Sequence, residues 1–156
     1  MLALVLVLPG CGYQPVRPVH IAPELQPVYV RDNSALGIAI KRQLKAAVIA
    51  LAITSAEAAS SLQLINTQMN SRGQTVSLTG RDAEMLRQLQ ATVIWQTANG
   101  KVLLEQQLDA ETLQIANPDN PLAEYNERDT IENNLTQALT QQVLRMLRTV
   151  DPAELR

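Results

Sequence analysis

The feature that most constrains the fold is an apolar stripe in the last third of the chain. Between residues 121 and about 149, apolar side chains recur at every fourth position, which places them on one side of a helix. They are Ile131, Leu135, Leu139, Val143 and Leu147, with Met146 and Val150 beside them. Arg145 and Arg148 lie late in this segment and acidic residues lie early, which suits the helix dipole. The sequence therefore predicts a long helix that must bury one side against another layer.

A β-hairpin is predicted before this helix. Over residues 86–96 apolar and polar side chains alternate, as in a strand with one buried face. The apolar series is Leu86, Leu89, Ala91, Val93 and Trp95, and the polar series is Gln88, Gln90, Thr92 and Gln96. The turn signal Asn99-Gly100 follows. In the second strand, residues 102–111, one predicted face holds Val102, Leu104, Leu108 and Ala110, and the other holds Glu105, Gln107, Asp109 and Glu111.

The first half of the chain predicts a strand, a helix and a further extended segment. Residues 25–30 form the strand, and Pro27 marks its start or the edge of the sheet. The helix spans residues 34–50 behind the N-cap segment Asp32-Asn33-Ser34. Its apolar stripe is Leu36, Ile40, Leu44, Val48 and Leu51. Residues 54–61 are predicted as a loop, and residues 62–78 as a hairpin turning at residues 70–73 or as one long bent strand.

Together these elements predict an α/β fold of the α+β type, a two-layer sandwich. Two helices pack on one face of a mostly antiparallel sheet of about four strands. The domain is expected to span residues 25–150, followed by a tail at 151–156. Because Phe is absent and aromatic residues make up only 3% of the chain, the core must be aliphatic, with Met69, Met85 and Met146 inside it. The glutamine-rich face of the sheet is left for water or a polar partner.

The N-terminal residues indicate attachment to a membrane. Residues 1–10 are uncharged and too few to span a bilayer. We expect a secretory signal that is truncated or has a misplaced start, because no basic residue precedes Arg17. Cys11, the only cysteine, follows directly, with Leu8 three residues before it. This arrangement resembles a bacterial lipobox, which implies cleavage before Cys11 and its acylation. The alternatives are a free buried thiol, an intermolecular disulfide, and a metal or nucleophilic site.

A tether is predicted between the anchor and the domain, over residues 11–24. Pro15, Pro18, Pro23 and Pro27 exclude a helix in this part of the chain. Gly12, rather than Asp, follows the cysteine, and by analogy with lipoprotein sorting this favours the outer membrane over the inner one. The expected location is therefore a lipid anchor in the outer membrane, with the domain facing the periplasm.

Catalytic chemistry is not indicated. His20 is the only histidine and lies in the predicted tether, so no zinc site can be built from it and Cys11. There is no glycine-rich phosphate loop and no nucleophile elbow. A formal net charge of −2, without basic clusters interleaved with aromatic residues, argues against a nucleic-acid partner. We expect a non-enzymatic protein with no metal and no cofactor.

Four basic residues lie near predicted strand ends or turns: Arg72, Arg81, Arg87 and Lys101. A cluster of such cations can bind the phosphates of an anionic lipid, and arginine does so with two parallel hydrogen bonds. The alternative is that they are ordinary solvated charges.

With these residues in place, the chain resembles the LptE family of lipopolysaccharide-assembly lipoproteins. The resemblance is carried by residues 11–13 (CGY), 36–44 (LGIAIKRQL), 61–64 (SLQL), 91–93 (ATV) and 120–129 (NPLAEYNERD). It implies two helices against about four strands, and a plug inside the outer-membrane β-barrel LptD that aids barrel folding and lipopolysaccharide delivery. It also makes lipopolysaccharide the lipid expected at the four cations. The alternative function is an accessory binding module of an ABC-type exporter or another envelope complex.

Overall fold

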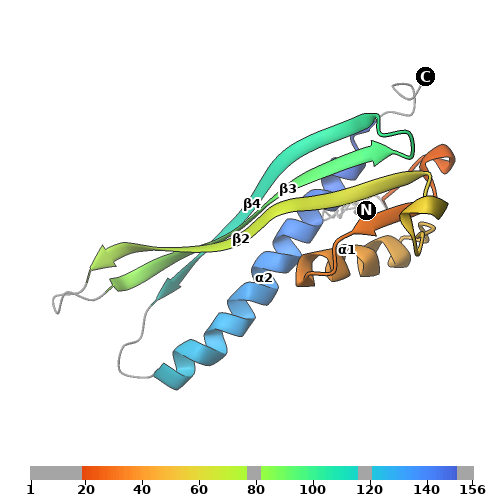
Figure 1. Ribbon diagram of the computed structural model, residues 1–156. Coiled ribbons are helices and arrows are strands. Elements are labelled where there is room, and N and C mark those ends of the chain that lie inside the picture. Colours follow the sequence, from red (N-terminus) through yellow and green to blue (C-terminus); the bar gives the residue numbers. More distant parts are fainter. Residues whose placement is uncertain (1–18, 77–81, 116–120, 151–156) are drawn as a thin grey trace, which may run out of the picture.

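The computed structural model describes residues 19–76, 82–115 and 121–150. It has two layers, a four-stranded sheet and two helices that cover one of its faces (Figure 1). The elements in chain order are η1 (Pro23–Leu25), β1 (Val28–Arg31), α1 (Ala35–Ala46), η2 (Ser55–Glu57), β2 (Ser60–Val76), β3 (Asp82–Thr97), β4 (Val102–Ile115) and α2 (Pro121–Leu147). The predicted α+β two-layer fold is confirmed.

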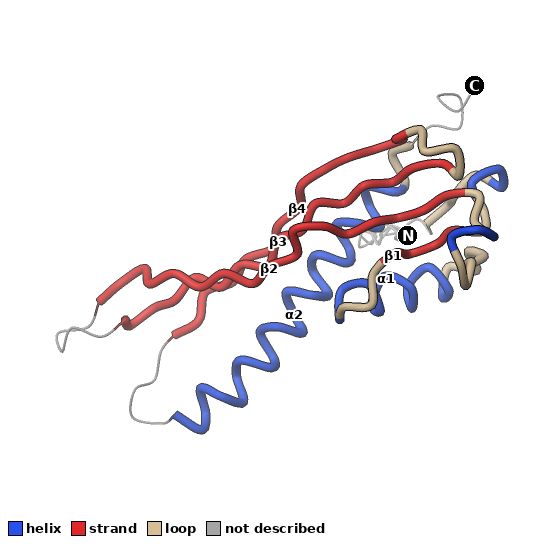
Figure 2. The backbone as a smooth tube through the Cα atoms, viewed as in Figure 1, coloured by secondary structure: helices blue, strands red, loops and turns tan. Residues whose placement is uncertain are grey.

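The sheet is wide at one end and narrow at the other. Its strands lie in the order β1-β2-β3-β4, with β1 parallel to β2 and the other pairs antiparallel. β1 pairs only with Ser60 to Gln63 of β2, so three strands continue beyond it (Figure 2). We call the end with β1 and α1 the base. The tip begins at the cross-strand row of Gln68, Gln90 and Asp109 and runs away from the base.

β2 is one long strand, which decides between the two interpretations of residues 62–78. Residues 70–73 pair in sequence with β3, from Asn70 opposite Gln88 to Gly73 opposite Met85, and do not form a turn. The strand bends at a register shift between Ile65 and Gln68. Asn66 lies in that shift at φ 53°, a left-handed conformation that asparagine tolerates better than most residues.

The predicted hairpin of β3 and β4 is confirmed, but the prediction placed two of its residues on the wrong face of the sheet. Leu86 alternates with Gln88 and so lies on the polar face, opposite Leu113 of β4. A register shift beside Trp95 pairs Val102 with Gln96, which places Val102 on that same face, exposed. The alternation of apolar and polar residues in the sequence does not reveal such a shift.

The core lies between the helices and the base half of the sheet. All five residues of the α2 stripe are buried, and Met146 is buried beside them, as predicted. They pack with Leu36, Ile40 and Leu44 of α1 and with Leu62, Leu64, Leu89, Ala91, Val93, Trp95, Leu108 and Ala110 of the sheet. Val19 and Ile21, which the sequence placed in the tether, are also buried in this core. Met69 is exposed and Met85 half-buried, so neither lies inside the core as predicted.

α1 begins where predicted and ends early. The Ser34 hydroxyl accepts the Gly37 amide at 3.3 Å, the expected N-cap. The helix stops at Ala46 rather than at residue 50, since the Ile49 amide donates back to the Leu44 carbonyl and the Val48 amide to that of Lys45, both at 3.0 Å. This is the Schellman ending, with Val48 left-handed at φ 61°. Val48 is therefore not part of the buried stripe.

α2 ends at Leu147, two residues before the predicted position 149. Among the helices of the described part of the chain, none has both the length and the apolar character needed to cross a bilayer.

Candidate functional site

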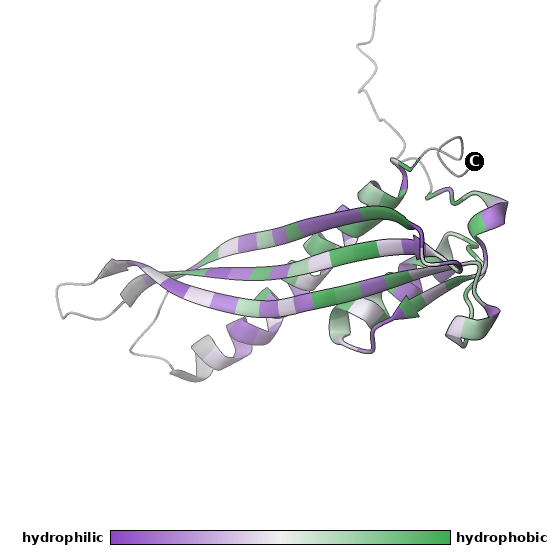
Figure 3. Ribbon diagram, turned by 45° about the horizontal axis from the view of Figure 1, so that its top comes forward, coloured by the Kyte–Doolittle hydropathy of each residue, from purple (hydrophilic) through white to green (hydrophobic). Residues whose placement is uncertain are grey.

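In the described part of the chain, the two helices cover only one face of the sheet, and the other face is free of helices (Figure 1). α2 packs on β3 and β4, and α1 packs on β1 and α2, all on the other face. In Figure 3 the sheet lies in front of the helices, with greener strands toward the base and more purple strands toward the tip. Alternation along the strands brings six glutamines to this outer face: Gln63, Gln68, Gln88, Gln90, Gln96 and Gln107.

The centre of this outer face is a shallow hollow lined with amides. It has a volume of about 230 Å³ and lies at the bend of β2, between Asn66, Gln68, Gln90 and Gln107, with Ala91 and Thr92 beneath. The bend opens the hollow because Asn66 occupies the extra position in the strand. None of the lining side chains is charged. The hollow can therefore donate and accept hydrogen bonds without requiring a counter-charge.

The tip of the outer face combines a cation with apolar side chains. Arg72, Leu86 and Leu113 form one row across β2, β3 and β4. In a neighbouring row, Ile115 lies opposite Glu84. Leu113 is 51% exposed and Ile115 70% exposed. The row of Arg72, Leu86 and Leu113 thus presents a cation beside apolar side chains. It complements an anionic amphiphile, which has a negative group next to an apolar chain.

The structure separates the four predicted cations. Arg72 is exposed on the outer face, whereas Arg87 points to the helix layer, where its Nε donates to Gln114 Oε1 at 2.9 Å. Lys101 lies at the β3–β4 turn, at the base, with its amide donating to Thr97 Oγ1 at 3.2 Å. Arg81 lies outside the described residues. Arg72 and Arg87 are thus near one another along the strands but on opposite faces, and Lys101 is at the other end of the sheet.

A polar contact on the inner face of the tip was missed from the sequence. The Gln114 side chain is 1% exposed; it accepts from Arg87 and donates to Glu127 Oε2 at 3.5 Å, which joins β3, β4 and α2. A signal was present, since Gln114 continues the buried alternation of Leu108 and Ala110. The contact satisfies a buried amide where the apolar core has ended.

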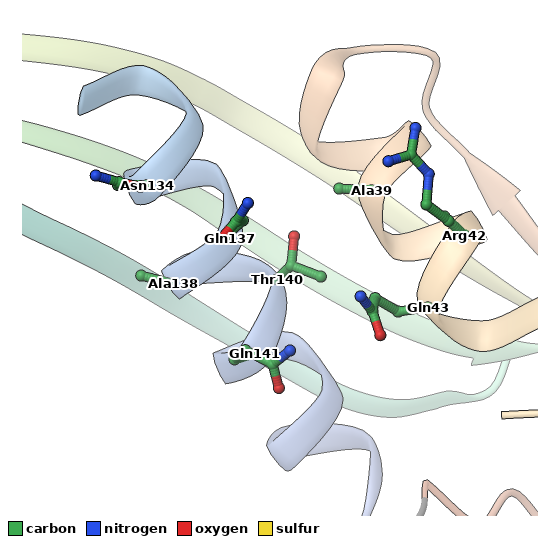
Figure 4. Close-up of a pocket in the computed structure, with 8 residues that line it drawn as sticks. All are labelled: Ala39, Arg42, Gln43, Asn134, Gln137, Ala138, Thr140 and Gln141. Carbon is green, nitrogen blue, oxygen red and sulfur yellow. The ribbon is translucent and has the colours of Figure 1, made fainter. Parts of the chain in front are cut away.

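A second groove lies between the two helices. It measures about 480 Å³ and is lined by Arg42 and Gln43 of α1 and by Asn134, Gln137, Thr140 and Gln141 of α2. Figure 4 shows these side chains on the two sides of the groove. Thr140 is buried and its hydroxyl is bonded to the Thr136 carbonyl at 2.7 Å, so it offers nothing to a ligand.

Catalytic and metal-binding geometry is not seen in the described ranges. No group of three His, Cys, Asp or Glu side chains there is placed to hold a metal ion. His20 is exposed just before η1, without a carboxylate or nucleophile bonded to it among the contacts of these ranges. Cys11, the predicted acylation site, lies outside the described residues.

The LptE family model, described as lipopolysaccharide-assembly, matches residues 22–147. The chain belongs to the LptE family. The match begins just before η1 and ends with the last residue of α2, so it spans both layers of the LptE fold described above. A comparison with curated proteins finds no match.

Solved structures of lipoproteins share this LptE-family fold. An uncharacterized lipoprotein B from Nitrosomonas europaea is 16% identical, with a TM-score of 0.67 over 76% of this chain and 79% of that one. The rare lipoprotein B from Shewanella oneidensis is 12% identical, with a TM-score of 0.66 over 77% and 90%. A minor lipoprotein from Acinetobacter baumannii is 15% identical, with a TM-score of 0.63 over 78% and 89%. Family membership gives this protein a general role in lipopolysaccharide assembly as a lipoprotein of the cell envelope, in a family whose members are non-enzymatic.

Proposed function

We propose that the protein is an outer-membrane lipoprotein, acylated at Cys11, that plugs an LptD-like β-barrel and assists its assembly for lipopolysaccharide delivery. The observation that carries the proposal is the outer face, which is long, free of helices and polar, with six glutamines and the carboxylates of Glu105, Asp109 and Glu111 on it. The lumen of a large outer-membrane barrel is polar. Neutral amides can pair with either donors or acceptors there, whereas an unpaired carboxylate or ammonium group would be costly to bury.

The first test is recovery of the barrel with the protein in mild detergent. The variant Gln68→Glu with Gln90→Glu places two carboxylates opposite one another in the amide hollow. We expect it to lower the recovered barrel about tenfold or more, since leaving charges unpaired at an interface costs several kcal/mol and each 1.4 kcal/mol is tenfold in affinity. Mass spectrometry of the co-purified proteins is the measurement.

The control makes the same chemical change on the helix layer. Gln137→Glu with Gln141→Glu alters two exposed residues of α2 and adds the same two charges. Equal recovery of the barrel with both double variants would remove the outer face from the proposal. Recovery of the unsubstituted protein with an inner-membrane permease instead of a barrel would favour the exporter module.

We further propose that Arg72 leads the contact with lipopolysaccharide, ahead of Arg81, Arg87 and Lys101. Its row with Leu86 and Leu113 matches a phosphate next to an acyl chain, and Arg72 is exposed. Arg87 is held by Gln114, and Lys101 is at the base.

Arg72→Glu is expected to weaken binding of purified lipopolysaccharide about tenfold, because a charge-assisted hydrogen bond contributes roughly 1.5–3 kcal/mol. Titration by fluorescence or calorimetry measures the change. Arg145→Glu, at an exposed position of α2, makes the identical change in net charge. If the two variants bind equally, Arg72 is a solvated charge only.

A further inference from the structure

An uncharged, largely exposed loop lies at the base of the molecule, from the last residue of α1 into η2. Residues 46–56, between Lys45 and Glu57, contain no charged side chain, and only Thr54 and Ser55 among them are polar. Val48 is 90% exposed and Ile53 is 87% exposed. Single exposed aliphatic residues are ordinary on a protein surface. Val48 and Ile53, however, lie within one uncharged stretch of the base, where they form an exposed apolar surface outside the core.

The conformation of Val48 adds an independent observation. The residue sits at φ 61° in the ending of α1, where glycine or asparagine is usual. A β-branched side chain is disfavoured in this left-handed region. Burial of the Val48 side chain does not offset the cost of this conformation, because the side chain is exposed to solvent. An exposed apolar side chain in this disfavoured conformation indicates a role for Val48 outside the folded core.

The loop is fixed to the segment that leads toward Cys11. Gln26 Nε2 donates to the Ile21 carbonyl at 2.8 Å, and Gln26 Oε1 accepts the Ala50 amide at 3.1 Å. Val28 adds two backbone bonds to the same segment, to the Ala50 carbonyl and from the Ala52 amide, each 2.9 Å. Ile21 itself is buried. The loop and residues 19–21 therefore form one rigid unit, at the same end of the sheet as β1 (Figure 1).

The length of chain to Cys11 limits how far this unit can lie from a membrane. Val19 lies eight positions after Cys11, and eight residue steps of fully extended chain span at most about 29 Å. An acylated Cys11 would thus keep Val19, at the end of the molecule that carries the loop, within about 29 Å of the bilayer surface.

We propose that residues 46–56 rest on the phospholipid surface to which Cys11 is attached, with Val48 and Ile53 at the boundary between headgroups and acyl chains. The inference rests on the proposed acylation of Cys11. Residues 46–56 carry no charge themselves, so the proposed contact is apolar in origin and does not require anionic lipid.

The test supplies the anchor chemically, so that it does not depend on acylation in the cell. The full chain, prepared without acylation, is coupled through the Cys11 thiol to maleimide-bearing lipid in phosphatidylcholine vesicles. Ile53→Trp reports contact with the bilayer through quenching by brominated acyl chains. We expect about a twofold loss of the added emission, because a side chain at the headgroup–acyl boundary meets the bromine atoms.

Tyr125→Trp is the matched control, since it adds a tryptophan at an exposed aromatic position of α2, far from the base. Its emission is expected to stay unquenched, and Trp95, which is buried in every variant, is subtracted as a common background. Equal quenching of the two variants, or none in Ile53→Trp, overturns the inference. A tryptophan that binds lipid by itself would produce the former result.

Amide hydrogen exchange on the unsubstituted chain gives a second measurement. Exchange over residues 46–56 is expected to slow on coupling to vesicles, while exchange over residues 68–76 of the tip stays the same. Unchanged exchange in the loop contradicts the inference. The intact mass of protein extracted from membranes tests acylation separately, so a missing acyl group would refute the anchor and leave the lipid contact to stand or fall on the vesicle experiments.

Discussion

Replacing Trp95 with alanine is expected to lower the free energy of unfolding by about 3–5 kcal/mol, a loss typical of deleting a buried aromatic side chain. Trp95 is 1% exposed and lies between Leu62 of β2 and Leu104 of β4 in the sheet. It is the only tryptophan in a chain without phenylalanine, and it is among the largest fully buried side chains. Urea denaturation followed by circular dichroism at 222 nm measures the change without relying on tryptophan emission.

Trp95→Phe separates the packing of the ring from its polar atom. The Trp95 Nε1–H is buried and has no hydrogen-bond partner in the described part of the molecule. Phenylalanine removes this unsatisfied donor, which offsets part of the lost contact area. We expect a loss below about 1.5 kcal/mol, the usual cost of a modest change in core shape. A loss for Trp95→Phe as large as that for Trp95→Ala would contradict this expectation.

Gly37→Ala is expected to destabilise the protein by about 1–3 kcal/mol, although alanine normally stabilises a helix over glycine. An added Cβ would lie 2.7 Å from the Asp32 carbonyl oxygen and 2.8 Å from the Asp32 Cβ. That backbone is held in place, because the same carbonyl accepts Lys41 Nζ at 2.7 Å. Thermal and urea unfolding measure the effect.

Ala46→Gly calibrates the helix propensity at an exposed position of α1. It is expected to cost at most about 1 kcal/mol. If Gly37→Ala instead raised the stability by that amount, the close approach between Gly37 and Asp32 would be absent in solution.

Periodicity in the sequence predicted the layers and the face on which the glutamines lie. The α2 stripe from Ile131 to Leu147 and the alternation from Leu89 to Trp95 are both long enough to determine one buried side. Both describe elements that pack along much of their length, so local pattern and tertiary environment agree. The prediction of Ser34 as an N-cap succeeded for a similar reason, since a cap is a local interaction.

The failures occurred where the environment changes within one element. Met69 follows the period of the inner face, but it lines a groove with Ser34 to Leu36 and with α2, and its side chain is exposed. Val48 keeps the spacing of the α1 stripe after the backbone has already turned. Val102 depends on register, which a shift of one residue inverts, whereas Leu86 has the spacing of Gln88 and was assigned to the wrong face. The separation of Arg72 from Arg87 is also a matter of register, and a linear chain does not reveal it.

The shape of the molecule has a mechanical consequence. At the base, the side chains of both helices and four strands interlock, whereas the tip is held by a three-stranded backbone ladder, one helix and the contact of Arg87, Gln114 and Glu127. The free energy of local opening rises with such packing, so we expect the tip to deform more easily than the base. A tip that deforms easily can adjust its shape inside a narrow enclosure while the fold of the base stays unchanged.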